Sequence, residues 1–385
     1  MTVTVGIPRN ADPDETRIPL VPDVVAKLTT LGVHVVVEQG ATDKAFLPLD
    51  TLGEVTVVES STAVLDAADI IWTVGNLDPR VAARLRPGHL LIGLLRPYDD
   101  AENVLTLAHQ GVTSFAMELL PRISRAQSMD VLSSQGTAAG YQCVLIAAAR
   151  APKFFPMLTY AAGTIRPSRV LIVGAGVAGL QAIATAKRLG AIVTGYDVRP
   201  ETREHIESLG ATFVDTGVSA TGEGGYAREL THTEQEQQTA ALAKAVADSD
   251  VLITTAAVPG KMAPTIITRA MVESMRPGSV IVDMAAESGG NVEGTVVGKE
   301  MAVGGARVIG PRNLPGRMPT HTSEMFAKNL FNFTAPMIRD AGLWIDWDDE
   351  VIAQTTLTHE GRVHAHVAEI LGIIDPPTLP GKEGR

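Results

Sequence analysis

A glycine-rich turn is the clearest candidate for chemistry in the sequence. Gly174, Gly176 and Gly179 are spaced as G-x-G-x-x-G between a strand-like apolar run and a segment with helical periodicity. In such a turn the first glycine permits a sharp bend and the second lets a pyrophosphate approach the backbone, while the third allows close helix-to-strand packing. Val177 and Ala178 begin the helix, so their N–H groups are expected to face the phosphates. The pattern predicts a dinucleotide site.

An acidic residue follows the next predicted strand, as this motif requires. Asp197 stands roughly 20 residues beyond the turn, where a carboxylate accepts hydrogen bonds from the hydroxyls of the adenine ribose. A negative charge there repels a 2′-phosphate, which favours NAD over NADP, although Arg199 two residues later leaves NADP open. Val198, Arg199 and Ala257, which follow two predicted strands, are also predicted to bind the cofactor.

Two series of short apolar runs alternate with helical patterns and would position this turn. The chain of 385 residues is long enough for two domains. Strand–helix alternation with apolar strands predicts parallel sheets covered on both faces. We therefore predict an α/β protein with two doubly wound, Rossmann-like domains separated by a cleft. The predicted strands are residues 3–7, 33–38, 70–74, 90–95 and 112–118, then 170–173, 191–196, 211–214, 251–255, 280–284 and 306–309.

The domain boundary is predicted where a polar stretch, residues 121–134, gives way to a helix-compatible segment, residues 137–151. A later amphipathic helix, residues 323–338, has an apolar side suited to packing on the first domain. The C-terminal helices are thus expected to return to that domain. The predicted domains are 1–133 plus 320–385, and the NAD(H)-binding domain 134–319.

A polar stretch between Thr216 and Gln238 is long for an α/β connection and contains Tyr226. Two interpretations stay open for it, a mobile lid over the site and a surface loop without a role.

Charge and composition exclude several functions. The net charge of −11, with no Lys/Arg stripe, argues against nucleic-acid binding. Apolar runs are too short to span a membrane, and the N-terminus lacks the features of a signal peptide, so we expect a cytoplasmic protein. The single Cys143 is expected to be an inert core thiol. His364 and His366 lack further ligands at metal-binding spacing, so no metal site is predicted.

The string from Pro121 to Asp130, P-R-I-S-R-A-Q-S-M-D, resembles the NAD(H)-binding component, called domain I, of the nicotinamide nucleotide transhydrogenases. The resemblance covers nearly the whole chain and thins after about Ile338; it includes the glycine turn and residues 224–227, 259–261 and 283–287. It implies a Re/Si-specific, proton-translocating transhydrogenase, in which hydride passes directly between NADH and NADP(H) bound on a partner subunit.

Partners follow from the same resemblance. It implies an NADP(H)-binding subunit and a membrane-spanning subunit that conducts protons, with this chain docked at the cytoplasmic side of the inner membrane. It also implies a homodimer.

The resemblance assigns the nicotinamide end of the nucleotide to Arg122, Gln127, Asp130 and Ser133, and the tyrosine of a mobile loop to Tyr226. A carboxamide has one acceptor and two donor hydrogens, so Arg122 suits its oxygen while Asp130 and Ser133 suit its nitrogen. Gln127 is neutral and bifunctional, and could reach the second nucleotide. The alternative is a helix cap, since Ser128, Asp130 and Ser133 all suit a helix start.

Alanine dehydrogenase is the competing resemblance, over the glycine turn and residues 283–290. That family oxidises an amino acid with a histidine and a lysine, whose positions fall on Arg96 and near Gly75, and neither can act as the base. Its arginine for the substrate carboxylate matches Arg17, and an aspartate matches Glu287. A third interpretation is a non-enzymatic NAD-sensing module with Tyr226 as its switch.

Overall fold

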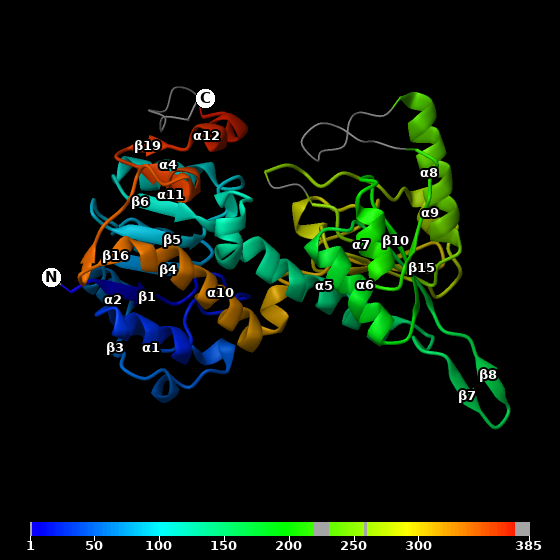
Figure 1. Cartoon of the computed structure of the whole chain (residues 1–385), viewed down its shortest axis with the longest axis horizontal. Helices are drawn as coiled ribbons and strands as arrows, with labels where there is room; N and C mark the ends of the chain where they lie inside the picture. The colour runs from blue at the N-terminus through cyan, green and yellow to red at the C-terminus, as the bar shows by residue number, and fades with distance from the viewer. Residues whose placement is uncertain (1, 219–230, 258–259, 374–385) are drawn as a thin grey trace. The chain divides into compact units, whose positions relative to one another are not determined.

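The computed structural model describes residues 2–218, 231–257 and 260–373, and the chain forms two compact units (Figure 1). Unit 1 comprises Met1–Gln135 and Gly316–Arg385, and unit 2 comprises Gly136–Pro315. Helix α5 (Val131–Arg150) begins in unit 1 and ends in unit 2. Each unit is a Rossmann-like α/β structure, as the sequence predicted.

Unit 1 is built on an eight-stranded sheet in the order β19-β18-β6-β5-β4-β1-β2-β3. The six strands from β6 to β3 are parallel to one another. The strands are β1 (Thr4–Ile7), β2 (His34–Glu38), β3 (Thr56–Val58), β4 (Ile70–Val74), β5 (Leu90–Leu94), β6 (Thr113–Ala116), β18 (Thr356–His359) and β19 (Arg362–Val363). The helices of unit 1, besides the start of α5, are α1 (Pro22–Thr30), α2 (Ser61–Ala67), α3 (Pro79–Ala82), α4 (Ala101–His109), α10 (Pro319–Thr334), α11 (Glu350–Thr355) and α12 (Ala365–Leu371).

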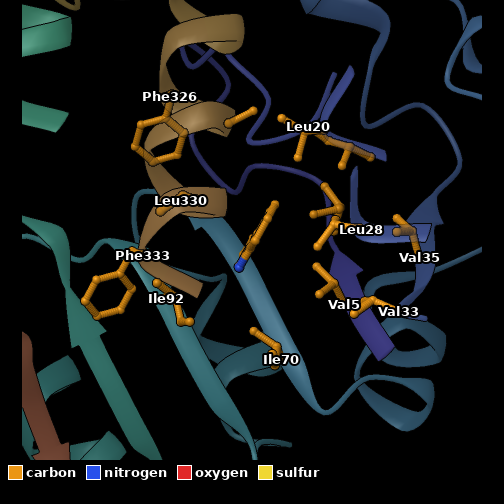
Figure 2. Packing of buried hydrophobic residues seen from close by; sticks show 14 of the residues in the cluster. Val5, Leu20, Leu28, Val33, Val35, Ile70, Ile92, Phe326, Leu330 and Phe333 are labelled. Carbon is orange, nitrogen blue, oxygen red and sulfur yellow. The ribbon is translucent and has the colours of Figure 1, made fainter. Parts of the chain in front are cut away.

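The sheet of unit 1 carries a hydrophobic core on each face. Ile70 and Trp72 of β4 join one core, and Ile71 between them joins the other. Such a strand has no solvent-facing side, which explains why its residues are apolar except for Thr73, which is buried as well. Figure 2 shows Phe326 and Leu330 of α10 packed within the first core, so the C-terminal return to the first domain is confirmed.

Unit 2 has a seven-stranded sheet in the order β11-β10-β9-β12-β13-β15-β14, parallel except for β14. Val170 and Leu171 of β9 again point into opposite cores. The strands are β9 (Arg169–Val173), β10 (Ile192–Tyr196), β11 (Thr212–Phe213), β12 (Val251–Thr254), β13 (Val280–Asp283), β14 (Glu300–Val303) and β15 (Ala306–Ile309). The helices are α6 (Val177–Arg188), α7 (Thr202–Ser208), α8 (His232–Ala247) and α9 (Arg269–Glu273).

The sheets are parallel as predicted except toward their edges, where β14, β18 and β19 pair antiparallel. Strand β18 pairs antiparallel with β6, and its threonines made the segment look polar in the sequence. The Thr358 hydroxyl shares a hydrogen bond of 2.6 Å with Ser114 and donates one of 2.9 Å to Val112 O, which allows these side chains to be buried.

Two further features differ from the predictions. An exposed antiparallel hairpin, β7 (Leu158–Tyr160) with β8 (Gly163–Ile165), extends from unit 2 and was not predicted because its strands have only three residues each (Figure 1). The stretch between Thr216 and Gln238 is predicted to be a lid or a surface loop, but its last residues are helical, because α8 begins at His232. A capping box between Thr231 and Glu234 stabilises that helix start.

Candidate functional site

The glycine turn of unit 2 lies between β9 and α6, and each glycine is required for a different reason. Gly174 has φ +99°, and a Cβ there would lie 2.5 Å from Thr255 Oγ1. At Gly179 a Cβ would overlap the carbonyl oxygen of Gly174. At Gly176 the place of a Cβ has no described atom within 4 Å, so this backbone is open to an approaching group. The turn therefore has the geometry of a phosphate-binding loop.

The first turn of α6 adds to this geometry. Gly176 is its N-cap, and no side chain caps the helix. Val177 is exposed and Ala178 is buried. The N–H groups at this end, together with the helix dipole, favour an anion such as a pyrophosphate.

Asp197 follows β10, and its carboxylate accepts hydrogen bonds from both the glycine turn and Arg199. The Oδ2 atom accepts from Ala175 N at 2.7 Å and from Arg199 Nη2 at 3.0 Å, and Oδ1 accepts from the backbone N of Arg199 at 2.9 Å and from its Nε at 3.0 Å. Burial alone raises the pKa of Asp197, but these hydrogen bonds outweigh it and hold the pKa below its usual value. The side chain is 7% exposed, so Asp197 is a buried, ion-paired acid rather than an isolated charge.

The opposite side of the turn is formed by the segment after β12, where sequence reasoning singled out only the exposed Ala257. Thr255 Oγ1 donates to Gly174 O and Val173 O at 3.2 Å, and thereby holds the two strand ends together. The fully buried Asn291 binds both backbone groups of the neighbouring Ala256. Sequence reasoning missed Thr255 and Asn291 because their partners are backbone atoms far away in the chain.

The loop predicted to contact the nicotinamide end lies in unit 1. Arg122 and Gln127 are exposed, and neither side chain has a hydrogen bond or ion pair with the residues that the structure describes. Asp130 precedes α5, and its Oδ1 accepts from Ser133 N at 2.9 Å while its Oδ2 accepts from the Ser133 hydroxyl at 2.5 Å. The helix-cap alternative therefore holds for Asp130, because it satisfies an N–H in the first turn of α5.

Helix α10 holds this loop in place. Asn329 Nδ2 and Asn332 Nδ2 each donate to Ser128 O at 2.9 Å, and the Ser134 hydroxyl donates to Asn329 Oδ1 at 2.7 Å. The sequence signal was an amide, Asn329, next to Leu330 on the apolar side of a helix.

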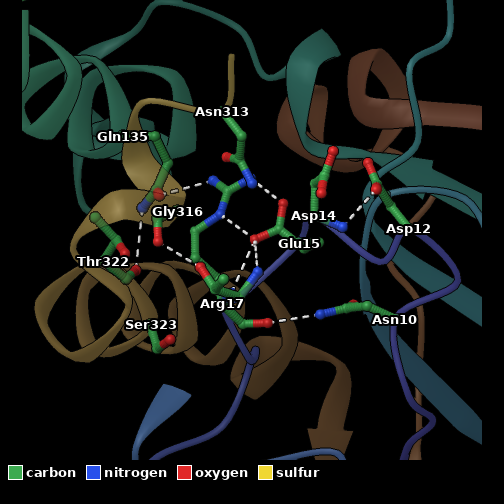
Figure 3. A network of polar contacts seen from close by, with 12 residues as sticks. Asn10, Asp12, Asp14, Glu15, Arg17, Gln135, Asn313, Gly316, Thr322 and Ser323 are labelled. Atoms are coloured by element: carbon green, nitrogen blue, oxygen red, sulfur yellow. Dashed lines mark hydrogen bonds and ion pairs between the residues drawn. The ribbon is translucent and has the colours of Figure 1, made fainter. Parts of the chain in front are cut away.

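The arginine that alanine dehydrogenases use for a substrate carboxylate matches Arg17, which is engaged within unit 1 (Figure 3). Its Nε and Nη2 donate to Glu15 Oε1 and Oε2, each at 2.8 Å, and its Nη1 donates to Gln135 Oε1 at 2.8 Å. The Arg17 and Glu15 side chains are 9% and 8% exposed. A buried fork-to-fork pair of this kind already neutralises the guanidinium.

The positions matched to the histidine and lysine of that family lie at the ends of β5 and β4. Arg96 has φ +49°, and its N–H donates to Glu118 Oε1 at 2.8 Å while Leu95 N donates to Glu118 Oε2 at 3.2 Å. Burial raises the pKa of Glu118 to about 7, against the lowering effect of these N–H groups. Gly75 has φ +91° and offers no side chain.

Other candidates supply no chemistry to these sites. In the described residues no cluster of three His, Cys, Asp or Glu side chains is arranged to hold a metal. None of the helices that the structure describes is long and apolar enough to cross a bilayer. Cys143 is buried on α5, and Glu287 accepts from Asn313 N at 3.0 Å. Tyr226 lies outside the described residues.

Known proteins resemble this chain over most of its length. The family descriptions "Alanine dehydrogenase/PNT, N-terminal domain" and "Alanine dehydrogenase/PNT, C-terminal domain" match residues 6–139 and 143–366. The first part of NAD(P) transhydrogenase subunit alpha of Rhodospirillum rubrum is 42% identical over 374 residues, which covers 93% of this chain and 97% of that protein. Alanine dehydrogenase of Bacillus subtilis is 30% identical over 300 residues, 75% of this chain and 72% of that protein.

Solved structures agree with these relationships. The transhydrogenase from Sinorhizobium meliloti superposes with a TM-score of 0.85 at 42% identity, covering 94% of this chain and 100% of that one. An L-alanine dehydrogenase superposes with a TM-score of 0.79 at 24% identity, covering 96% of this chain and 99% of that one, and shows the shared fold alone.

Proposed function

The chain belongs to the alanine dehydrogenase/PNT family, and we propose that it is the NAD(H)-binding component of a proton-translocating NAD(P) transhydrogenase. The observation that carries the proposal is the likeness to the first part of NAD(P) transhydrogenase subunit alpha over nearly the full length of both chains. Within the chain, unit 2 supplies a complete glycine turn with the acid Asp197 beyond it.

The proposed reaction is direct hydride transfer from NADH to NADP⁺ bound on a partner subunit. Hydride passes from the C4 carbon of one ring to the C4 carbon of the other, so no heteroatom gains or loses a proton and no general acid or base is needed. This agrees with Arg96 and Gly75 at the positions where the dehydrogenases have a histidine and a lysine. It also agrees with Arg17 being paired with Glu15 rather than open to a substrate carboxylate.

The chain's residues then act by positioning. Exposed Arg122 donates to the carboxamide oxygen, Asp130 and Ser133 accept from its nitrogen, and Gln127 extends toward the second nucleotide. Holding two rings about 3–3.5 Å apart with water excluded can supply roughly 7–11 kcal/mol of the barrier. Tyr226 is included among the proposed nucleotide-binding residues.

The NADP(H) site belongs to a partner, because the sequence of this chain has one G-x-G-x-x-G nucleotide-binding turn, and the Asp197 carboxylate beyond it disfavours the 2′-phosphate of NADP(H). A membrane-spanning subunit conducts the protons, and this chain docks to it from the cytoplasmic side. A homodimer is also included in the proposal. The apolar surface of the β7–β8 hairpin and its flanks supports it, with Met157, Leu158 and Tyr160 at 63%, 40% and 54% exposure.

The decisive experiment mixes the purified chain with a purified NADP(H)-binding partner and follows hydride transfer from NADH to an NADP analogue. Turnover that needs both proteins is expected. Reduction of NAD by L-alanine with this chain alone would contradict the proposal, since it would require the base that Arg96 and Gly75 do not provide.

A further inference from the structure

A buried amide side chain shapes one wall of the nucleotide site in unit 2. Asn291 Oδ1 accepts from Ala256 N at 3.0 Å, and its Nδ2 donates to Ala256 O at 2.8 Å and to Pro264 O at 2.9 Å. The amide of an asparagine offers donors and an acceptor in one rigid plane. Asn291 therefore fixes the orientation of both peptide groups that flank Ala256.

Asn291 is itself held by the carboxylate of Asp283, which is fully buried at the end of β13. Asp283 Oδ2 accepts from the N–H groups of Asn291 and Val292 at 2.9 and 3.0 Å and from the Thr295 hydroxyl at 2.8 Å. Its Oδ1 accepts from Thr254 Oγ1 at 2.9 Å and from Ala285 N at 3.1 Å. These hydrogen bonds join the ends of β12 and β13 to the loop that carries Asn291.

The close approach of this loop depends on a glycine. Gly290 has φ +85°, and a Cβ there would lie 2.8 Å from Asp283 Oδ2. Asp283, Gly290 and Asn291 therefore form one hydrogen-bonded unit, and the Asn291 amide of this unit binds Ala256.

Strand order shows which half of a dinucleotide this wall faces. In the sheet, β9 lies between β10 and β12. Asp197 follows β10 on one side of the glycine turn, and Ala256 follows β12 on the other. A nucleotide with its adenine ribose at Asp197 and its pyrophosphate at the turn extends its nicotinamide half toward β12, because ligands lie across the carboxyl ends of the strands.

We propose that Asn291 is a positioning residue, which holds Ala256 and Ala257 so that they receive the nicotinamide half of NAD(H). The inference rests on the proposed function only for NAD(H) binding. It concerns neither the partner nor the hydride transfer.

The test compares NADH with AMP, which lacks the nicotinamide half, on the purified full-length chain without a partner. Asn291→Asp keeps the shape but places an oxygen against the carbonyls of Ala256 and Pro264. We expect its affinity for NADH to fall about tenfold or more and its affinity for AMP to change less than twofold. Asn291→Ala, which adds no repulsion, is expected to show the same selectivity to a smaller degree.

Ser249→Ala is the matched control. Ser249 is 5% exposed, lies just before β12 at its amino end, and donates one hydrogen bond of 2.7 Å to Ala245 O. It should lower the Tm without altering either affinity. Equal losses for NADH and AMP, unchanged NADH binding in the folded variants, or unfolding of both variants would overturn the inference. Failure of the unaltered chain to bind NADH would instead overturn the proposed function, and this inference with it.

Discussion

Replacing Asp197 by asparagine tests how the acid beyond the glycine turn selects its nucleotide. The carboxylate accepts one hydrogen bond from Ala175 N and three from Arg199. An asparagine keeps the shape and one acceptor oxygen, but its amide nitrogen must face a donor. The charge that neutralises Arg199 is also lost.

Hydrogen bonds to a charged group contribute about 1.5–3 kcal/mol each. Losing one such bond to the adenine ribose raises the Kd for NADH roughly ten- to hundredfold. The effect on NADPH has the opposite sign, because a carboxylate about 4 Å from a phosphate charge costs about 4 kcal/mol at an effective dielectric constant of about 20. Arg199, whose side chain is 38% exposed, then becomes available to the 2′-phosphate. We expect the preference for NADH over NADPH to fall at least tenfold.

Isothermal titration with NADH and NADPH measures both affinities in the full-length chain. Asp250→Asn is the matched control, since Asp250 is also nearly buried in unit 2 and accepts from Lys153 Nζ at 2.5 Å and from Arg169 N at 3.0 Å. Asp250 lies at the amino end of the sheet, so the Asp250→Asn substitution should lower the stability of the fold without changing nucleotide binding. If Asp197→Asn lowered the Tm like this control but left the NADH and NADPH affinities unchanged, the assignment of Asp197 would be refuted.

Three further predictions concern other regions of the chain. Gly179→Ala should abolish NADH binding and cost about 1–3 kcal/mol of stability, because its Cβ would overlap Gly174 O. The control Gly136→Ala should be tolerated, because the nearest atom to its Cβ lies 4.0 Å away. Equal NADH affinities of the two variants would contradict the geometry. Gln127→Asn should slow partner-dependent hydride transfer while the Kd for NADH stays within twofold of its original value. The control Ser124→Ala, on the same turn, should change neither the transfer rate nor the Kd. A large loss of NADH binding in Gln127→Asn argues against the role given to Gln127. The pKa of Glu118 is raised by burial from 4.5 to about 7, so the folded protein keeps a proton that the unfolded chain releases in this range, and stability should fall by up to about 3 kcal/mol as pH rises through it. In Glu118→Gln that component of the pH dependence should vanish from urea unfolding curves, and an unchanged slope would show that Glu118 does not titrate there.

Local signals in the sequence were sufficient for much of the fold. The strand residues 70–74 and 170–173 are apolar except for Thr73 because both faces of each sheet are covered, so their pattern is visible without a structure. The edge strands were not predictable in this way. Strand β18 has three polar residues, and its Thr358 is buried where Ser114 and Val112 supply hydrogen-bond partners.

The sequence by itself determined the glycine turn, because its function depends on residues adjacent in the chain and on the missing Cβ atoms of Gly174, Gly176 and Gly179. It also indicated the acid Asp197, because one helix, one short turn and one strand separate it from the glycines. Only the tertiary structure decided that Asp197 binds the backbone of Ala175 across the glycine turn and that Asn291 binds Ala256 from 35 residues away. Such contacts depend on which strands become neighbours in a sheet, and no local pattern of side chains encodes that order.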